Sequence, residues 1–389
     1  MANTLTFDQV STILNAVVQQ ATGQTSIAPV DTASFIAMGQ KALQVGYDPL
    51  ATAISQVLSR TIFSIRPYSE HFKGLRVDNA KYGNHVRKLT SIDRDFVDSK
   101  VYSLTDGQAI DQYEVRKPKV LQTNFYGEEV FQDFVTIYTV QIDSAMQSPE
   151  QFGEFISMIV QNVTDRITQG NENMARMCLA NMIGAKAEAD VGNVIHLLTE
   201  YNAYTGSSFT ATTIKAPANY DGFIKWAYAR IRNISDLFTE RSAKFHMNIT
   251  GSAVMRHTPY ANQKLYLSSF DMNQIDTRVL SSAFNEDRLR LIDYEPVNFW
   301  QSIETPGSIS VKPSYINASG TVIESEETTT VANIFGVLFD EEAVGYTITD
   351  ESIERTPYNA RGKYYNQFYS NCRKYWNDLT ENFVVFCID

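Results

Sequence analysis

The clearest pattern of apolar and polar positions in the chain lies between residues 148 and 184. Apolar residues recur there at spacings of three and four, which places them on one face of an α-helix. An unbroken helix over this span is about 55 Å long at 1.5 Å per residue. The residues that share the face are Phe152, Phe155, Ile156, Ile159, Val163 and Ile167.

Local signals mark both ends of this predicted helix. Ser148 followed by Pro149 is typical of a helix start, because the serine hydroxyl accepts a hydrogen bond from the first turn and proline tolerates the first position. Gly184 is a natural C-cap, so the pattern predicts that the helix ends there. Gly170 is a candidate position for a kink.

Shorter helical patterns lie in residues 1–66. The segment DPLATAISQVLSR begins with Asp48 as a candidate N-cap and Pro49 at the first helical position. The segment DQVSTILNAVVQQATG has apolar residues at helical spacing: Val10, Ile13, Leu14 and Val17. These pieces have too little apolar surface for a domain of their own. We expect an arm that lies on a larger body.

The apolar pattern fades between residues 74 and 126. This segment has many charges, little periodicity and a turn signal at Asp106 and Gly107. A structureless loop of such length is unusual inside a domain. We therefore predict a protruding hairpin that has a partner surface.

The following part of the chain alternates helical and strand patterns. A helical stripe over residues 220–238 comprises Phe223, Ala227, Ile231 and Ile234. Residues 244–250 and 289–300 have the composition of strands. Residues 301–330 are polar, turn-rich and acidic, and we interpret them as a surface insertion.

Three further strands are predicted near the end of the sequence. They are VANIFGVLFDEEAVGYTIT (331–349), KYYNQFYSNCRKYW (363–376) and ENFVVFCI (381–388). Between the first two, Thr356-Pro357 and Arg361-Gly362 bracket a segment with the length of a hairpin loop.

The segment from Arg355 to Trp376 mixes basic and aromatic residues, a combination that lines grooves for single-stranded nucleic acid. It contains no acidic residue, and its basic residues are Arg355, Arg361, Lys363, Arg373 and Lys374. The whole chain, however, has a net charge of −11, which disfavours binding to phosphates. We therefore favour a strand with aromatic residues on both faces, preceded by a tight turn.

The composition is that of a folded protein, with 43% hydrophobic residues, and the length of 389 residues suggests two or three domains. Cys178, Cys372 and Cys387 form no C-x-x-C pair, which favours a reducing compartment over a disulfide framework. The N-terminus does not resemble a signal peptide, and no apolar run approaches the ~18 residues of a membrane span. We expect no membrane contact.

The sequence offers little sign of catalysis. It has no common nucleotide, hydrolase or zinc-protease motif. The neighbouring carboxylates at 128–129 and 340–342 are more typical of solvated turns than of a catalytic pair across a substrate. The histidines are scattered, with no pair that could share a metal: His71, His85, His196, His246 and His257. We predict no catalytic residue, no cofactor and no metal.

The end of the sequence carries motifs of a known family. GVLFDEEAVG leads through the turn PYNARG into an aromatic strand, and ENFVVF follows. With the helical arm, the charged hairpin and the long helix, these motifs resemble major capsid proteins of tailed bacteriophages. The similarity is to the Hong Kong 97-type fold in the branch of small short-tailed phages. The matching positions are Pro357, Asn359, Arg361, Gly362, Tyr364, Asn382, Val384 and Phe386.

The resemblance implies an α+β capsid fold with six consecutive parts. They are an N-terminal arm (1–66), an extended E-loop that lies over a neighbouring subunit (67–126), a P-domain that includes the spine helix 148–184 (127–217), an A-domain with the insertion 301–330 (218–340), further P-domain strands with a hairpin (341–379) and a C-terminal strand (380–389).

The resemblance also implies a subunit interface. In the family, the P-domain hairpin tip lies where subunits meet around local three-fold axes, so the interface candidates here are Pro357, Asn359, Arg361 and Gly362. Pro357 would fix the entry to the turn, Gly362 would supply a positive φ or a close approach, and Arg361 would donate a forked hydrogen bond to a neighbouring subunit. The aromatic residues of the next strand would pack on the spine helix and adjacent segments: Tyr364, Tyr365, Phe368 and Tyr369.

The implied function is structural and not enzymatic. Copies would assemble as hexamers and pentamers into the icosahedral shell around the double-stranded DNA genome of a virion. Further partners would be a separate scaffolding protein, because the arm is too short to be one, a portal protein, and packaged DNA through non-specific contact. Assembly would occur in the host bacterial cytoplasm. The alternatives are an encapsulin-like compartment, whose chains are shorter, and a carbohydrate-active enzyme, which the aromatic and acidic residues suggest.

Overall fold

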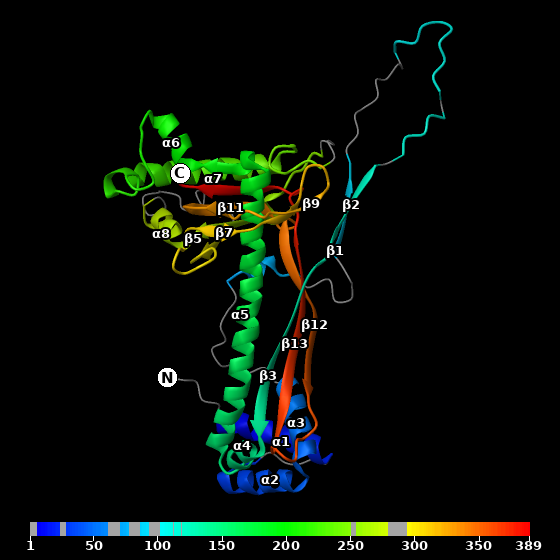
Figure 1. Ribbon diagram of the computed structural model, residues 1–389, viewed down its shortest axis with the longest axis vertical. Helices are drawn as coiled ribbons and strands as arrows, with labels where there is room; N and C mark the ends of the chain where they lie inside the picture. The colour runs from blue at the N-terminus through cyan, green and yellow to red at the C-terminus, as the bar shows by residue number, and fades with distance from the viewer. Residues whose placement is uncertain are drawn as a thin grey trace.

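The other helices and strands of the molecule lie along one long helix and at its two ends (Figure 1). In this computed structural model the helix follows the longest axis, with several shorter helices at one end and a five-stranded sheet at the other. A two-stranded hairpin projects from the side of the sheet end. The structure describes residues 6–23, 29–60, 71–77, 86–92, 102–111, 113–117, 119–249, 254–278 and 294–389.

The long helix, α5, spans Pro149–Ala189. It begins where the sequence predicts, with Ser148 as N-cap and Pro149 at the first position. The Ser148 hydroxyl accepts a hydrogen bond from the backbone N–H of Gln151 at 3.4 Å. Proline costs nothing at the first position, because the N–H that it lacks would have no partner inside the helix.

The predicted end of the helix at Gly184 is wrong. α5 continues to Ala189, and it also runs without interruption through Gly170. Both glycines are positions of close packing. A Cβ on Gly184 would lie 2.5 Å from Cγ2 of Val311, and one on Gly170 would lie 2.8 Å from Nη2 of Arg373. At Gly184, glycine is therefore favoured by the approach of Val311 and not by the helix backbone, and at Gly170 it leaves room for the Arg373 guanidinium.

The N-terminal helices pack around the start of α5. They are α1 (Phe7–Thr22), α2 (Thr32–Gln44) and α3 (Tyr47–Arg60), and α4 (Thr139–Ala145) lies beside them. Val10, Leu14 and Val17 are buried in one cluster with Phe152 and Ile156 of α5. The expectation that these helices lie on a larger body is confirmed. α3 begins at Tyr47, two residues before the predicted first position Pro49, so Asp48 lies in its first turn and is not the N-cap.

Two sheets accompany α5. The antiparallel three-stranded sheet has the order β12 (Val344–Arg355), β13 (Tyr364–Asn377), β3 (Gly127–Tyr138). The five-stranded sheet has the order β4 (Val194–His196), β14 (Phe383–Cys387), β11 (Ile334–Asp340), β5 (Gln263–Ser268), β6 (Tyr294–Val297). The segment predicted as one strand at 331–349 therefore holds β11 and the start of β12, which belong to different sheets.

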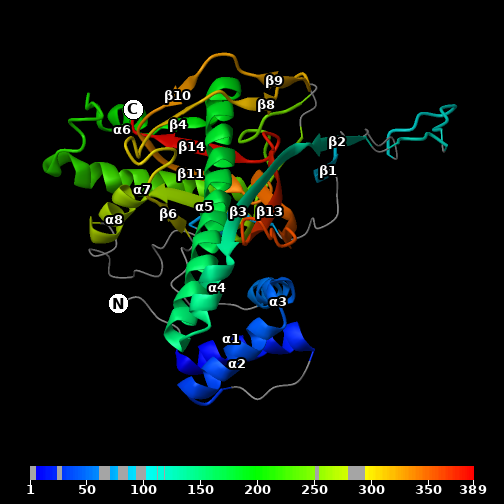
Figure 2. The ribbon, with the colours of Figure 1, turned by 60° about the horizontal axis from the view of Figure 1, so that its bottom comes forward.

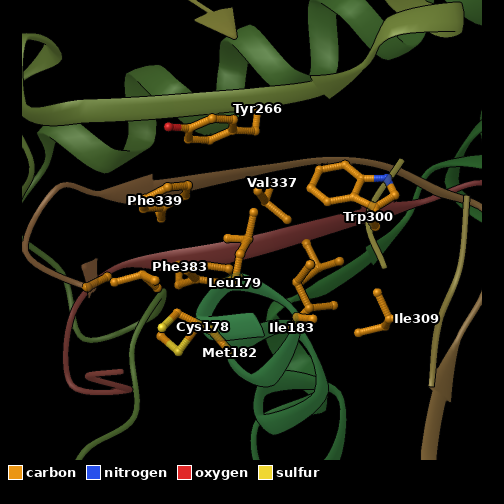
Figure 3. Packing of buried hydrophobic residues seen from close by; sticks show 14 of the residues in the cluster. Cys178, Leu179, Met182, Ile183, Tyr266, Trp300, Ile309, Val337, Phe339 and Phe383 are labelled. Atoms are coloured by element: carbon orange, nitrogen blue, oxygen red, sulfur yellow. The ribbon is translucent and has the colours of Figure 1, made fainter. Parts of the chain in front are cut away.

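The main core lies between the second half of α5 and one face of the five-stranded sheet (Figure 3). Cys178, Leu179 and Ile183 pack there against the sheet residues Val337 and Phe383. Helices α6 (Leu197–Thr205), α7 (Pro217–Thr239) and α8 (Ser269–Arg278) contribute to a second core on β11 and β14. The stripe predicted for α7 is buried in that core, as expected: Phe223, Ala227, Ile231 and Ile234.

Two strand predictions fail in whole or in part. Residues 244–249 are irregular, although Phe245 and Met247 are buried, and residue 250 lies outside the described residues. Apolar composition alone does not distinguish a buried loop from a strand. Within 289–300, only β6 is a strand, and residues 289–293 lie outside the described part of the chain.

The segment 301–330 is more than a surface insertion. It forms β7 (Ile309–Val311), β8 (Ser314–Ile316), β9 (Val322–Glu324) and the start of β10 (Thr329–Val331), which cross the end of α5 (Figure 2). The Asn181 side chain donates to the Ser314 carbonyl at 3.0 Å and accepts from the Ser314 N–H at 2.9 Å. Ile309 is buried in the main core. One side of the segment therefore covers α5.

The predicted hairpin between 74 and 126 is present. β1 (Val86–Ser91) pairs with β2 (Val120–Phe125) in antiparallel register to form a stem. Every described residue in 102–111 and 113–117 is exposed, and we name these two segments the hairpin tip. Figure 1 shows the tip extending away from the rest of the molecule.

Candidate assembly surface

The turn between β12 and β13 contains the four interface candidates, and all four are exposed. Its geometry depends on Asn359, whose Oδ1 accepts the N–H of Arg361 at 3.1 Å and that of Gly362 at 3.0 Å. The Asn359 N–H donates to the Tyr364 carbonyl at 2.9 Å. Pro357 precedes this closed loop, and the Arg361 side chain is left on its surface.

The positive φ in this turn belongs to Lys363, at 51°, and not to Gly362. Gly362 instead permits a close approach, because a Cβ there would collide with the ring of Tyr364. That ring packs edge-on against Tyr138 of β3, with 6.0 Å between the ring centroids. A side chain at position 362 would therefore disturb an aromatic pair that joins two strands.

Contacts with α3 fix the turn to the end of the molecule. The Arg355 guanidinium lies 2.8 Å from Oδ1 of Asp48 and also hydrogen-bonds the Thr52 hydroxyl. The ring of Tyr358 stacks on that of Tyr47, with centroids 5.9 Å apart. The turn is thus a supported surface feature rather than a free loop.

Three of the five basic residues in the Arg355–Trp376 segment face other parts of the protein. Arg373 is 1% exposed, and its guanidinium lies 4.1 Å from the ring centroid of Phe131 and 3.4 Å from a carboxylate oxygen of Glu129. Lys374 is buried, and Arg355 is paired with α3. Only Arg361 and Lys363 of the five are exposed. A continuous groove for phosphates is therefore not formed by this segment.

The aromatic residues of β13 divide between the two faces of the sheet. Tyr365 is buried in the cluster that holds the start of α5, as the resemblance implied, and Tyr369 is buried on the same side. Burial raises the pKa of Tyr369 to about 12. Tyr364 and Phe368 point to the other side, where Phe368 packs on Phe134 with centroids 5.7 Å apart. Two of the four aromatic residues therefore lie on the side of Tyr365 and two on the opposite side of the sheet.

The stem of the hairpin is tied to the body by charge. Nζ of Lys88 lies 3.1 Å from Oδ2 of Asp378 and 3.2 Å from Oε2 of Glu342, and it also pairs with Glu381. Arg256 pairs with the same Glu381 at 2.8 Å. Burial by itself would lower the pKa of Lys88, but the three carboxylates outweigh it and raise the pKa above its ordinary value.

The charged form of Glu381 is disfavoured in this cluster. Its pKa is raised, first because burial disfavours the carboxylate, although Lys88 and Arg256 act in the opposite direction. This cluster was not predicted from the sequence, since its members come from β1, from the segment before β5, from the turn before β12 and from the turn between β13 and β14. The only local signal is the pair of acids in DLTEN (378–382).

The carboxylates considered for catalysis have separate partners. Glu128 accepts from the Cys372 thiol at 3.2 Å, and Asp340 accepts from the Thr258 hydroxyl at 2.7 Å. Glu341 accepts from the side chain of Asn262. Each of these carboxylates is bound to a different partner, so the hydrogen bonds hold neighbouring parts of the fold together.

The histidines are also apart. His246 is buried, and its ring nitrogens contact Asn382 at 3.2 Å and the Val254 carbonyl at 2.7 Å. Burial lowers its pKa. His196 lies 2.6 Å from Asp389, His71 lies near Glu172, His257 is exposed, and His85 is outside the described residues. Across the residues that the structure describes, no three His, Cys, Asp or Glu side chains group as metal ligands.

The model of the Phi29-like phage major capsid protein family matches residues 14–387 of the chain. The chain belongs to this family. It is therefore a major capsid protein, a subunit of the shell of a phage head. The family match favours the phage shell over the compartment and the enzyme that the sequence left as alternatives. Comparison with curated protein sequences gave no match.

Solved structures share the fold of this capsid protein. A chain in the capsid structure of Staphylococcus phage Andhra is 10% identical with a TM-score of 0.57, and the match covers 85% of this chain and 87% of that chain. A chain in the structure of the head fiber and inner core protein gp22 of bacteriophage P68 is 8% identical with a TM-score of 0.54, again covering 85% and 87%. The expected capsid fold is confirmed. None of the helices in the described ranges is long and apolar enough to cross a membrane.

Proposed function

We propose that this capsid protein assembles with itself as hexamers and pentamers, and that the hairpin and the β12–β13 turn make the contacts between subunits. Membership of a capsid family supports self-assembly into a shell. The observation that best supports the proposal is the exposure of the hairpin tip. All its described residues are exposed, although several are apolar. A lone subunit buries none of the described residues of this segment, whereas a neighbouring subunit in a shell would cover them.

The structural regions suit the parts of the fold that the resemblance implied. We assign residues 1–66 to an N-terminal arm, 67–126 to the E-loop, 127–217 and 341–379 to the P-domain, and 218–340 to the A-domain. The C-terminal strand 380–389 contains β14, which pairs with β11 in the five-stranded sheet. We therefore group it with the A-domain.

The interface candidates occupy a position suited to subunit contact. Pro357, Asn359, Arg361 and Gly362 are exposed at one end of the molecule, and Asn359 holds the loop in one shape. In our proposal the Arg361 guanidinium donates to a carboxylate or carbonyl of a neighbouring subunit near a local three-fold axis. A preformed loop loses little conformational entropy when it binds, which favours its use as a contact.

Other partners follow from the same assignment. We propose a separate scaffolding protein, because α1 packs with its apolar side in the subunit core and is not a removable segment. We also propose a portal protein, and packaged DNA held by weak non-specific contact, which the net charge of −11 supports. Assembly takes place in the host cytoplasm, and the subunit has no catalytic activity of its own.

Replacement of the hairpin tip tests the proposal. A variant in which a short Gly/Ser linker replaces residues 93–117 keeps both stem strands, so its far-UV circular dichroism should match that of the wild type. It should form no shells by negative-stain microscopy, because the contact between subunits is gone. Shells formed at wild-type yield by this variant would show that the hairpin is dispensable for assembly.

A further inference from the structure

A cleft between the hairpin stem and the body of the subunit is lined by basic side chains, and we name it the basic cleft. Its volume is about 1150 Å³, and its walls come from β1, from the segment before β5 and from the turn after β11. Basic residues in its lining outnumber acidic ones by six to two, although the whole chain has a net charge of −11. Such a local excess of cations attracts anionic partners. The six basic residues are Arg76, Arg87, Lys88, Arg241, Arg256 and Lys264.

The subunit itself uses two of these six cations. Lys88 and Arg256 both pair with Glu381. The two acidic residues of the lining are engaged as well, since Glu342 pairs with Lys88 and Glu341 accepts a hydrogen bond from the side chain of Asn262. The other four basic side chains therefore give the cleft a positive charge that its own acidic residues do not balance.

The rest of the lining indicates what kind of anion the basic cleft takes. Leu89 and Met255 line it and are 63% and 44% exposed, so apolar surface lies beside the cations. Arginine and methionine are enriched where proteins contact one another. The volume exceeds the about 300–1,000 Å³ of small-molecule sites, which leaves room for a turn of several residues. The chemistry therefore fits a peptide segment that carries carboxylates and an apolar side chain.

The chain itself contains a segment of this kind. The end of β9 and the connection to β10 hold three exposed glutamates in four residues, and we name residues 324–327 the acidic turn. Val322, two residues before it, is 63% exposed. In Figure 2 the connection from β9 to β10 follows the outer edge of the molecule, so a partner can reach it. The three carboxylates belong to Glu324, Glu326 and Glu327.

The acidic turn does not occupy the basic cleft of its own subunit. β9 pairs with β8, and the N–H of Ser325 donates to the Pro313 carbonyl at 3.0 Å, which holds the turn against the 301–330 segment. No residue of that segment, which the structure describes throughout, lines the basic cleft. The acidic turn that neutralises the cleft is therefore that of another copy of the chain.

We infer that the acidic turn of one subunit binds in the basic cleft of a second subunit. This inference rests on the proposed function, because it needs subunits that lie side by side. It gives the 301–330 segment a role in assembly besides that of covering α5. A single exposed ion pair contributes little to stability, but three glutamates among four unbalanced cations form a network. Such charge complementarity fixes the register of two subunits and speeds their encounter.

Exchange of charges between the two surfaces tests this contact. Arg241 is exposed in the basic cleft, and Arg241→Glu should lower the yield of shells several-fold, because it places a carboxylate opposite the acidic turn. Glu326→Arg should lower the yield for the converse reason. The double variant restores opposite charges across the contact, so its yield should recover to near that of the wild type. If a thermal melt shows that Arg241→Glu does not fold, Lys264→Glu takes its place in the same cleft.

The matched control combines Lys41→Glu with Glu326→Arg. This double variant has the same net charge as the exchange, but Lys41 is exposed on α2 and does not line the basic cleft. It should therefore assemble no better than Glu326→Arg alone. A folded exchange variant that assembles no better than the single variants, or a control that recovers equally, would overturn the contact while leaving the proposed function intact. A wild-type protein that forms no shells would instead count against the proposed function.

Peptide binding measures the same contact without shells. A fluorescent peptide of residues 320–330 (GTVIESEETTT) should bind to unassembled wild-type subunits, and the binding should weaken as the salt concentration is raised. It should be several-fold weaker for Arg241→Glu subunits, and for a peptide with the changes Glu324→Gln, Glu326→Gln and Glu327→Gln. Equal binding of the two peptides would show that the cleft does not recognise the carboxylates, and the inference would be wrong.

Discussion

The ammonium group of Lys88 on the hairpin stem lies 3.1 Å from a carboxylate oxygen of Asp378 in the turn that precedes β14. The two side chains are 17% and 3% exposed, so the pair is largely shielded from water. It joins the projecting hairpin to the turn between β13 and β14. The direction in which the hairpin leaves the body is therefore set by an ion pair as well as by strand pairing.

Removal of the Lys88 side chain should lower the stability of the subunit. Lys88→Ala removes the ion-pair partner of Asp378 and leaves Glu381 paired with Arg256 alone, and the loss of one partner of a buried ion pair destabilises a fold by about 3 kcal/mol. We expect a loss of that size in the free energy of urea-induced unfolding of unassembled subunits. The pKa of Lys88 is raised, so its contribution is full at neutral pH and is lost only as the pH rises beyond ~10.4, the pKa of an unperturbed lysine.

Arg87→Ala is the control for this prediction. Arg87 is the neighbouring residue of β1 and is exposed, so its removal should change the free energy of unfolding by no more than ~0.5 kcal/mol. If both variants lose the same stability, the cluster around Lys88 does not hold the stem in place.

At Gly184, helix propensity and side-chain packing have opposite effects on the unfolding free energy of an alanine variant. In the middle of a helix, Gly→Ala ordinarily stabilises by about 1 kcal/mol. In α5, however, the new methyl group would lie 2.5 Å from Val311. Overpacking of this kind costs about 1–3 kcal/mol, so Gly184→Ala should lower the unfolding free energy and speed proteolysis of the 301–330 segment.

Gly192→Ala provides the comparison, because a Cβ at that position meets no atom within 4 Å. It should leave both stability and proteolysis nearly unchanged. A Gly184→Ala protein more stable than the wild type would mean that β7 does not press on α5.

The parts of the fold that the sequence predicts are those with local causes. The face of α5 and the stripe of α7 follow from apolar spacing within each helix, and the start of α5 follows from Ser148 and Pro149. The end of α5 does not, because the reason for Gly184 is a contact with Val311, far along the chain. Propensity cannot distinguish a glycine that ends a helix from one that admits a neighbour.

The Arg355–Trp376 segment illustrates the same limit for the candidate site. The amino-acid sequence shows which residues the segment contains, and the alternation of side chains along a strand predicts its two faces. The residues that pair with its charged side chains, however, lie far away in the sequence. Asp48 pairs with Arg355, and Glu129 pairs with Arg373. Only these long-range contacts show that most of the basic residues serve the subunit itself. The Lys88 cluster was missed for the same reason, because its carboxylates lie in distant turns.

Arg361 remains exposed after these assignments, and it is the residue on which the assembly proposal makes its sharpest prediction. Arg361→Glu changes no described contact within the subunit that depends on the guanidinium, since the turn is held by the backbone N–H of Arg361 and by Asn359. The variant should therefore be soluble and folded, with a thermal melt like that of the wild type. It should fail to close into shells, because the new carboxylate faces the acceptor that the guanidinium would bind.

Lys41→Glu makes the same change of charge at an exposed position in the last turn of α2, and it should assemble normally. Binding to single-stranded DNA should be weak for the wild type and for both variants, since Arg355, Arg373 and Lys374 are not available to phosphates. Light scattering and electron microscopy measure assembly, and a salt titration of fluorescent DNA measures binding. Tight, salt-sensitive DNA binding that Arg361→Glu abolishes, together with normal shells, would assign this turn to nucleic acid instead of to a neighbouring subunit.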